Sequence, residues 1–311
     1  MSRLDWVGIQ KKTRYQHNMH IIGTLCAIGA GIFFGFIGPV TKIAYNLGVG
    51  IGLAIILRYL IAIILISPFI ISNKPTFAMY KKQIWMLMLL TSGSILLTTG
   101  LLISVKYIDV SLAILIFSTY PIIVLFVSIL IDKEKIDLKI KLVFLITFSG
   151  LFLVLGPSLE SLNIFGVSSA IIASVGASII ILTNQKLSNR QISTIHINAF
   201  TNLFNFIFFI IVISLFFEIN IHISVKAWLI ILIPSFCYAV AFFLQLSAIP
   251  RIGQSKTALL LYTEPMIAVL VAIVLLKEVL NFFQSLGAII VISSLIFATY
   301  NTNKKIKNEF S

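Results

Sequence analysis

Long apolar runs without a charged residue constrain this sequence more than any other feature. Asp, Glu, Lys and Arg are absent from 83–105, 161–185, 197–217 and 279–303. A helix of about 20 apolar residues is long enough to cross the hydrocarbon core of a bilayer. Only 11% of the 311 residues are charged, which is too few to cover the surface of a soluble domain. We therefore predict a polytopic membrane protein.

Ten apolar runs can be distinguished along the chain. They are unbroken rather than alternating, so the pattern favours helices over the strands of a transmembrane barrel. The predicted fold class is an all-α polytopic membrane protein with ten transmembrane helices and short loops. The runs lie near 20–43, 51–72, 83–105, 109–131, 138–157, 163–184, 195–217, 227–249, 256–276 and 282–302.

Lys and Arg are concentrated in alternate loops. If the N-terminus is cytoplasmic, the cytoplasmic segments hold 18 of them and the opposite segments hold 4. Because cytoplasmic loops are enriched in Lys and Arg, this bias predicts that both termini are cytoplasmic. It also accounts for the net charge of +13 without a nucleic-acid partner. The abundance of Ile, Lys and Asn indicates an AT-rich genome, so we expect a multi-pass protein of a bacterial inner membrane.

The two halves of the chain resemble each other at a constant offset of 144 residues. Each half contains five predicted spans, and an odd number of spans makes the second half enter the membrane from the opposite side. The sequence therefore predicts an inverted repeat of two five-helix units, 20–157 and 163–302, which is typical of alternating-access transporters. The matched residues include Thr119 with Thr263, Pro121 with Pro265, and Lys133-Glu134 with Lys277-Glu278.

The repeated motifs resemble the EamA domain of the drug/metabolite transporter superfamily. In the second half they are Thr257 to Met266, Leu275-Leu276-Lys277-Glu278 and Gly287; in the first half they are 111–116, Tyr120-Pro121, Lys133-Glu134 and Gly150. Arg58 also matches a position at which that family often has Arg. The resemblance extends from about Gly23 to Tyr300. One departure is that Tyr120 stands where the second half has Glu264, so the halves are not chemically equivalent.

Glu264 is the only acidic residue clearly inside a predicted span. It lies 8 residues after Lys256, which is about 12 Å along a helix and close to the bilayer midplane. A charge at that depth is costly unless it faces a cavity or a partner. One interpretation is a site for a proton or a cation. The other is a structural carboxyl group that hydrogen-bonds a backbone carbonyl freed by the neighbouring Pro265.

Prolines and one arginine inside the spans predict structural roles. Pro39, Pro121, Pro234 and Pro265 fall in spans 1, 4, 8 and 9, where proline produces kinks or hinges. Arg58 lies about six residues into span 2, and we expect its side chain to extend to the membrane interface. The alternative for Arg58 is an ion pair or an anion contact within the membrane.

The resemblance implies a central cavity lined mainly by spans 1, 3, 4, 6, 8 and 9. Carried over span by span, it identifies substrate-binding candidates with polar or aromatic side chains. Packing against lipid or a neighbouring helix is the simpler interpretation for each single Phe. The candidates are Phe36, Thr98, Ser118, Tyr120, Ser178, Tyr238, Phe242, Gln245, Tyr262 and Glu264.

The expected function is a secondary transporter of a small organic metabolite, amino acid or drug. We expect alternating access, export as the direction, and protons as a possible coupling ion. An uptake permease for metabolites such as S-adenosylmethionine is one alternative; a membrane-embedded enzyme or a channel is another. No HExxH, CxxC, paired-carboxylate or Walker pattern occurs, so no catalytic residue, cofactor or metal site is expected. The expected partners are a small-molecule substrate and the lipid bilayer.

Overall fold

The computed structural model describes eleven helices, which together cover most of the ten predicted runs. It describes residues 3–72, 77–108, 110–131, 133, 137–155, 163–216, 221–276, 282–283, 285–287, 289–294 and 297. The helices are α1 (Arg3–Asn46), α2 (Ile51–Ser72), α3 (Phe77–Tyr107), α4 (Val110–Phe117), α5 (Tyr120–Leu130), α6 (Leu138–Leu155), α7 (Ile164–Asn189), α8 (Thr194–Phe216), α9 (Val225–Ile252), α10 (Gln254–Leu260) and α11 (Thr263–Leu276). Glu134, Lys277 and Glu278 lie outside the described residues.

Seven helical segments among the described residues are long and apolar enough to cross a membrane. They are α1 from Asn18, α2, α3 from Lys81, the α4–α5 pair from Ala113, α7, α8 and α9. The other three predicted spans correspond to α6, to the α10–α11 pair and to an apolar helical stretch at 285–294. The described part of the chain is thus an all-helical multi-pass membrane protein.

Two helix pairs hold the centre of the bundle together, and they are related by the 144-residue offset. α1 packs against α9 and α3 packs against α7; the offset converts α1 into α7 and α9 into α3. Both pairs are antiparallel. Gly23 faces Arg251 while Gly29 faces Leu244, and Gly93 faces Gly176 while Gly100 faces Ser169. The same pairing is therefore built twice from different halves of the chain.

The span that follows α3 and the span that follows α9 are each broken into two helices, at positions that match by the 144-residue offset to within one residue. The first break separates α4 from α5 at Ser118 and Thr119, and the second separates α10 from α11 at Leu261 and Tyr262. The Thr119 hydroxyl donates to the carbonyl of Ile116 at 2.8 Å, and the Thr263 hydroxyl donates to that of Leu260 at 2.9 Å. A proline follows two residues after each threonine and lacks the N–H that a continuous helix needs.

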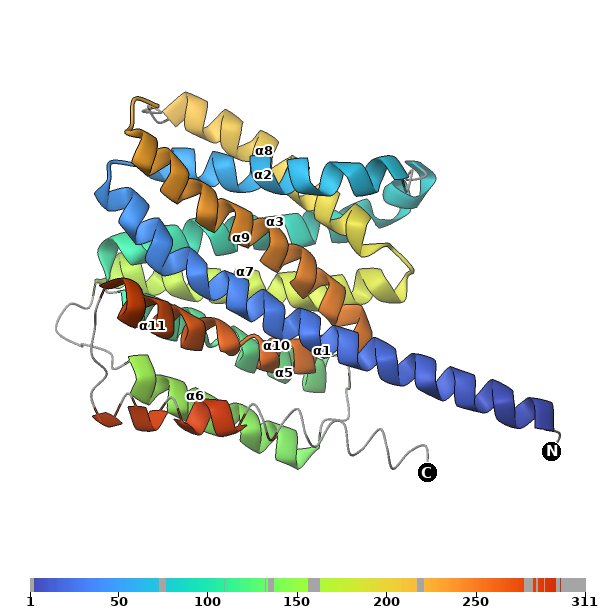
Figure 1. Cartoon of the computed structure of the whole chain (residues 1–311). Helices are drawn as coiled ribbons and strands as arrows, with labels where there is room; N and C mark the ends of the chain where they lie inside the picture. Colours follow the sequence, from blue (N-terminus) through green and yellow to red (C-terminus); the bar gives the residue numbers. More distant parts are fainter. Residues whose placement is uncertain are drawn as a thin grey trace.

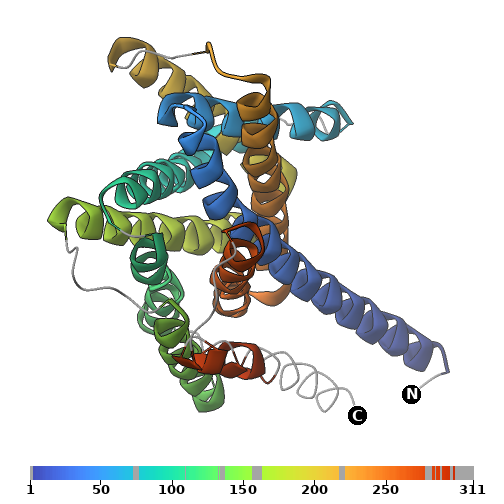
Figure 2. The same cartoon turned by 60° about the vertical axis from the view of Figure 1, so that its left-hand side comes forward.

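The two halves run in opposite directions through the bundle. In Figure 1, α1 runs from right to left, whereas α7, its counterpart by offset, runs from left to right. α6 lies beside the helical stretch at 285–294 in both Figure 1 and Figure 2. That contact is reciprocal: Thr147 and Ser294 share a hydrogen bond of 2.7 Å, and a Cβ on Gly150 would meet Val291 at 3.0 Å. The 144-residue offset takes Thr147 to Val291 and Ser294 to Gly150, so each of the two contacts is the counterpart of the other.

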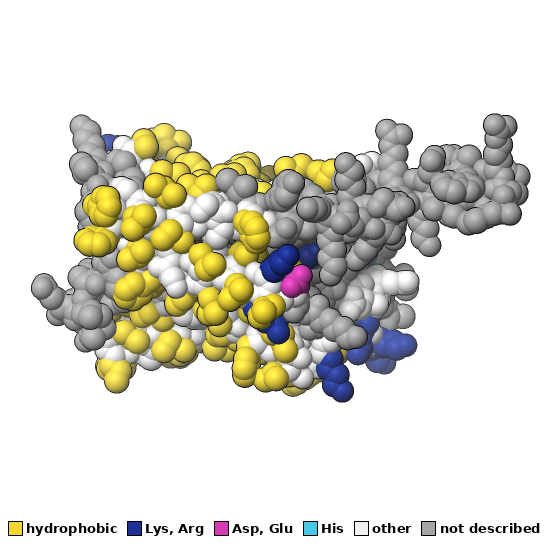
Figure 3. Space-filling view, turned by 90° about the horizontal axis from the view of Figure 1, so that it is seen from below, with side chains coloured by type: hydrophobic (Ala, Val, Ile, Leu, Met, Phe, Trp, Pro, Cys, Tyr) yellow, Lys and Arg dark blue, Asp and Glu magenta, His cyan; other side chains and the backbone are white. Residues whose placement is uncertain are grey.

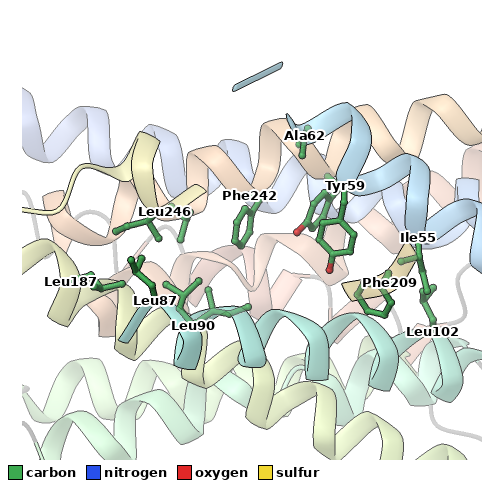
Figure 4. Close-up of a cluster of buried hydrophobic side chains, with 14 of the residues drawn as sticks. Ile55, Tyr59, Ala62, Leu87, Leu90, Leu102, Leu187, Phe209, Phe242 and Leu246 are labelled. Carbon is green, nitrogen blue, oxygen red and sulfur yellow. The ribbon is translucent and has the colours of Figure 1, made fainter. Parts of the chain in front are cut away.

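The largest buried cluster lies between α2, α3, α7, α8 and α9, and Figure 4 shows its side chains. Tyr59 is its centre, because its ring stacks on Phe209 at 5.5 Å and meets Tyr238 edge-on at 5.6 Å. Aromatic contacts of this kind add to the stabilisation that burial provides. The cluster packs α2 and α8 against α3 and α9, which belong to the two central helix pairs.

The surface separates apolar sides from a basic end. In Figure 3, hydrophobic side chains cover much of the described part of the visible face, and most of the visible Lys and Arg side chains lie from its middle toward the right. The start of α3, the start of α6 and the end of α7 carry exposed basic side chains, including Lys81, Lys139 and Arg190. An apolar side and a polar end are what a protein embedded in a bilayer requires.

Candidate functional site

A central cavity lies between helices from both halves of the chain. Its empty volume is about 1090 Å³, which includes space continuous with the outside. Its walls come from α1, α2, α3, α4, α5, α7, α9 and α11. The lining residues with polar, charged or aromatic side chains are Phe34, Thr41, Lys42, Tyr45, Arg58, Ser94, Phe117, Tyr120, Tyr238, Phe242, Gln245 and Glu264.

The cavity extends from the middle of the bundle toward one membrane side. Lys42 and Tyr45 lie near the end of α1, and Val105 lies near the end of α3, whereas Glu264 lies at the break between α10 and α11. The opposite side is filled by a packed cluster made of Ala27, Ala248, Ile252 and Leu260.

A buried hydrogen bond crosses this filled side between the two halves. The Nε2 of Gln254 on α10 donates to the Oγ of Ser128 on α5 at 2.9 Å, and both side chains are buried. We call the packed cluster and this hydrogen bond together the closed side. The side where α1 and α3 end is the open side.

An acidic and a basic side chain line the cavity. Glu264 contributes a carboxyl group from the first turn of α11, and Arg58 contributes a guanidinium from α2. Lys42 is exposed at the open side. Among the described residues, Glu264 and Arg58 form no salt bridge with each other or with a third group. A ligand in the cavity therefore meets both charges without first breaking an ion pair.

Arg58 is held by aromatic side chains rather than by an acid. Its guanidinium carbon lies 5.0 Å from the ring centroid of Tyr238, which is cation–π distance. Tyr238 in turn stacks on Phe242 at 5.6 Å. The side chain of Arg58 is only 7% exposed, so it lies inside the bundle and not on its surface. The reason is that the cavity gives the guanidinium a polar environment within the span.

Five of the ten candidate binding residues line the cavity. Tyr120, Tyr238, Phe242, Gln245 and Glu264 come from α5, α9 and α11. Tyr120, which replaces an acid at the position matching Glu264, faces the same space as Glu264. The halves therefore present different chemistry at equivalent places: a phenol from the first half and a carboxyl group from the second.

The other five candidates lie outside the cavity lining, and each has a local reason. Phe36 is 37% exposed, on the side of α1 away from Gly35 and Ile37, which line the cavity. The Thr98 hydroxyl bonds the Tyr59 hydroxyl at 2.7 Å. Ser178 donates to the carbonyls of Ser174 and Tyr120.

Ser118 and Tyr262 lie at the two helix breaks. Ser118 is 2% exposed and continues the last turn of α4 through a backbone bond to Ile114. Tyr262 points to α6, where its ring meets that of Phe144 at 6.4 Å. A residue in a break leaves the helical repeat, so its direction does not follow from its neighbours.

Several lining residues were not among the sequence candidates. Lys42, Tyr45 and Ser94 are not among the candidates, yet all three border the cavity. Membrane helices that are apolar all round have no polar stripe to mark the inward face. One usable signal was the four-residue spacing of Ser94 and Thr98 on α3, which indicates a polar face within an apolar helix.

The four predicted structural prolines take two different places. Pro39 lies inside α1 and Pro234 lies inside α9. Two further prolines are also inside helices, Pro68 in α2 and Pro250 in α9. Pro121 and Pro265 instead lie in the first turns of α5 and α11, directly after the breaks. The first turn of a helix tolerates proline because the N–H there has no helical partner.

No metal centre is evident in the described ranges, where no three His, Cys, Asp or Glu residues are grouped so as to hold an ion. Cys26 and Cys237 are free thiols on α1 and α9. The cavity therefore offers hydrogen bonds, charges and aromatic faces to a ligand.

Comparisons with known proteins identify relatives along nearly the whole chain. The chain is 25% identical over 316 residues to the uncharacterized transporter YetK of Bacillus subtilis (strain 168), covering 96% of this chain and 91% of that protein. A solved crystal structure of a protein with 15% sequence identity has the same fold, with a TM-score of 0.75. It covers 89% of this chain and 97% of the other.

The sequence profile of the EamA-like transporter family matches the chain twice, at residues 21–156 and 164–300. The two matches correspond to the two halves that pair through α1 with α9 and α3 with α7. The protein is thus built from two EamA repeats around the cavity, and the chain belongs to the EamA-like transporter family.

Proposed function

We propose that this protein is a secondary transporter that moves a small organic zwitterion across the membrane by alternating access. The observation that carries the proposal is the central cavity, into which Arg58 and Glu264 project from opposite halves of the chain. Arg58 can bind a carboxylate with a planar fork of donors. Glu264 can bind an ammonium group.

Aromatic side chains in the same cavity support an organic rather than an inorganic substrate. Phe34, Phe117, Tyr120, Tyr238 and Phe242 surround the polar groups. Binding sites for small molecules combine apolar walls with a few placed polar groups in this way. An inorganic ion would leave these apolar walls unused. The substrate is therefore a compound with a hydrophobic body and separated charges.

Alternating access is supported by the difference between the two ends of the cavity. The open side reaches Lys42 and Tyr45, while the closed side is filled by helix packing and by the Gln254–Ser128 hydrogen bond. Because the two halves run in opposite directions, exchanging their conformations would open the other side. With cytoplasmic termini, the state described here is outward-open. We propose export as the direction, with a proton moving through Glu264 in exchange.

The test begins with the purified full chain in detergent and a panel of cationic, anionic and zwitterionic metabolites. A stabilised melting transition identifies a ligand, and counterflow of the labelled ligand in proteoliposomes then tests transport. We expect zwitterions to stabilise the protein and the best of them to show counterflow. Arg58→Gln and Glu264→Gln should each weaken binding of that ligand, while Phe36→Leu, outside the cavity, should not.

Other outcomes would assign a different function. A current or flux without counterflow would indicate a channel, and covalent conversion of the ligand would indicate a membrane enzyme. Uptake of the ligand into right-side-out vesicles along a proton gradient, without exchange in everted vesicles, would indicate a permease. Stabilisation by anions alone would contradict the role given to Glu264.

A further inference from the structure

A row of buried polar side chains occupies one face of α8, away from the groups discussed above. Asn198, Thr201, Asn202 and Asn205 are each at most 2% exposed. Their spacing of three and four residues places them on one side of the helix. Asn205 donates its Nδ2 to the Oγ of Ser94 on α3 at 2.8 Å. These five residues together are called the polar seam.

The polar seam begins at the cavity and follows α8 toward its N-terminal end. Ser94, at one end, lines the cavity. Asn198 lies seven residues earlier than Asn205, which is about 10 Å along the helix toward the start of α8. Beyond that end, the exposed Arg190 donates to the Oε1 of Gln83 at 2.7 Å. The seam therefore spans the depth at which α1, α9 and α10 close the main route.

Four polar atoms of the seam have no hydrogen-bond partner among the described residues. They are the Oδ1 atoms of Asn202 and Asn205, the Oγ1 of Thr201 and the Nδ2 of Asn198. Hydrogen bonds satisfy only part of the row: Nδ2 of Asn202 donates to Asn198 within α8, and Nδ2 of Asn205 donates to Ser94 on α3. Polar atoms buried in a membrane protein require partners, since lipid supplies none.

The unpaired atoms include both hydrogen-bond acceptors and a donor, and this combination determines which ligand can satisfy them. A metal cation would satisfy oxygen atoms but would face the N–H of Asn198, and an anion would satisfy only donors. Water both donates and accepts, and buried waters typically make about three hydrogen bonds to such groups. The orientation of the Asn198 amide follows from its bond with Asn202, in which Oδ1 of Asn198 accepts. The unpaired Nδ2 is thus a real donor.

We propose that the polar seam binds a file of water molecules that connects the cavity with the closed side. Each side chain of the seam is at most 2% exposed, so an organic substrate cannot lie along it. The seam would let water enter and leave the cavity while the closed side stays shut to that substrate. The inference depends on the helix packing alone, and only its use in a transport cycle rests on the proposed function.

The test measures whether the seam is wet. Single cysteines are introduced at Thr201 and Asn202 in a background carrying Cys26→Ser and Cys237→Ser. The full-length variants in liposomes are exposed to silver ions in chloride-free buffer, and the remaining thiol is labelled with a maleimide after denaturation. Only a hydrated thiol ionises readily to the reactive thiolate. The matched control is Phe209→Cys, two turns further along the same face of α8 but within the apolar cluster.

We expect Thr201→Cys and Asn202→Cys to lose their free thiol at least about tenfold faster than Phe209→Cys, because thiolate is scarce in a dry apolar site. Ile207→Cys, on the exposed apolar face of α8, should react as slowly as Phe209→Cys. Thr201→Cys is nearly isosteric, so it remains informative if Asn202→Cys does not fold. Equal rates for the seam and control cysteines would overturn the proposal. Since no substrate is used, this result is independent of whether transport is found.

Discussion

At the residue scale, the cavity contains two ionisable side chains, Arg58 and Glu264, that form no salt bridge with each other among the described residues. A charged side chain in a transmembrane helix costs about 2.5–3.5 kcal/mol at the bilayer centre unless its surroundings compensate. Arg58 is compensated in part by the Tyr238 ring, and Glu264 faces the cavity rather than lipid. Leaving both charges available to a ligand is useful only if the cavity binds polar compounds.

Glu264→Gln tests whether the carboxyl group exchanges a proton during transport. Glutamine has the same shape and can still form hydrogen bonds, but it cannot release a proton. We expect the variant to insert and fold normally and to lose the pH dependence of transport in proteoliposomes. Glu264→Ala should also lower thermal stability if the carboxyl group hydrogen-bonds to a backbone carbonyl that Pro265 leaves without a helical partner. An unchanged pH profile in Glu264→Gln would make the residue structural.

Arg58→Lys tests the guanidinium as a carboxylate ligand. Lysine keeps the charge but loses the planar fork and the stacking on Tyr238. A charge-assisted hydrogen bond contributes about 1.5–3 kcal/mol, so we expect ligand affinity to fall by roughly 10- to 100-fold. Isothermal titration with the ligand found by the thermal screen measures this change. Lys42→Arg, at the exposed mouth, is the control and should leave affinity within a few-fold of the wild type.

At the element scale, close packing of helix backbones depends on glycine. A Cβ on Gly31 would lie 1.8 Å from the Oγ1 of Thr263, at the start of α11. A Cβ on Gly100 would lie 2.5 Å from the carbonyl oxygen of Ser169 on α7. Small residues let membrane helices approach closely enough for extensive van der Waals contact. α11 is therefore held against α1, and α3 against α7, by surfaces that tolerate no added atoms.

Gly31→Ala and Gly38→Ala form a matched pair on α1. Alanine at position 31 collides with Thr263, and we expect it to destabilise the protein by about 1–3 kcal/mol, the usual cost of overpacking. Alanine at position 38 meets no atom within 4 Å, so it should leave the unfolding midpoint unchanged or slightly raised. Thermal unfolding in one detergent compares the two variants directly. Equal midpoints would mean that α11 shifts freely along α1.

The sequence predicted elements better than it predicted the directions of side chains. Uncharged runs located α3, α7 and α8 because a bilayer imposes a minimum apolar length. The run at 109–131 was expected to be one helix kinked at Pro121, but it is two helices, since Thr119 and Pro121 together end one and begin the next. Of the candidate side chains, only half line the cavity, because an apolar helix carries no mark of its inward face.

At the scale of the whole molecule, the distribution of Lys and Arg makes a prediction about topology. Exposed basic residues at the starts of α3 and α6 and at the end of α7 lie at the ends we assign to the cytoplasm. We expect a cytoplasmic reporter fused after Ser311 to be active and a periplasmic reporter at the same place to be silent. A reporter inserted after Gly48, in the connection between α1 and α2, should give the reverse. Activity of the periplasmic reporter at the C-terminus would reject this topology.

The final prediction concerns the closed side. There the two halves of the chain are in contact, and the proposed transport cycle requires them to separate. Gln254 and Ser128 come from α10 and α5, and their side chains meet at 2.9 Å. If the closed side opens in each cycle, a short bifunctional thiol reagent linking Ser128→Cys to Gln254→Cys should abolish counterflow, and reduction should restore it. The background lacks Cys26 and Cys237, and each single cysteine variant treated with the same reagent is the control.

While linked, the protein should still bind ligand from the open side, because Arg58 and Glu264 remain in the cavity. Loss of binding together with transport would point to distortion of the site instead, and full transport by the linked protein would show that this side never opens.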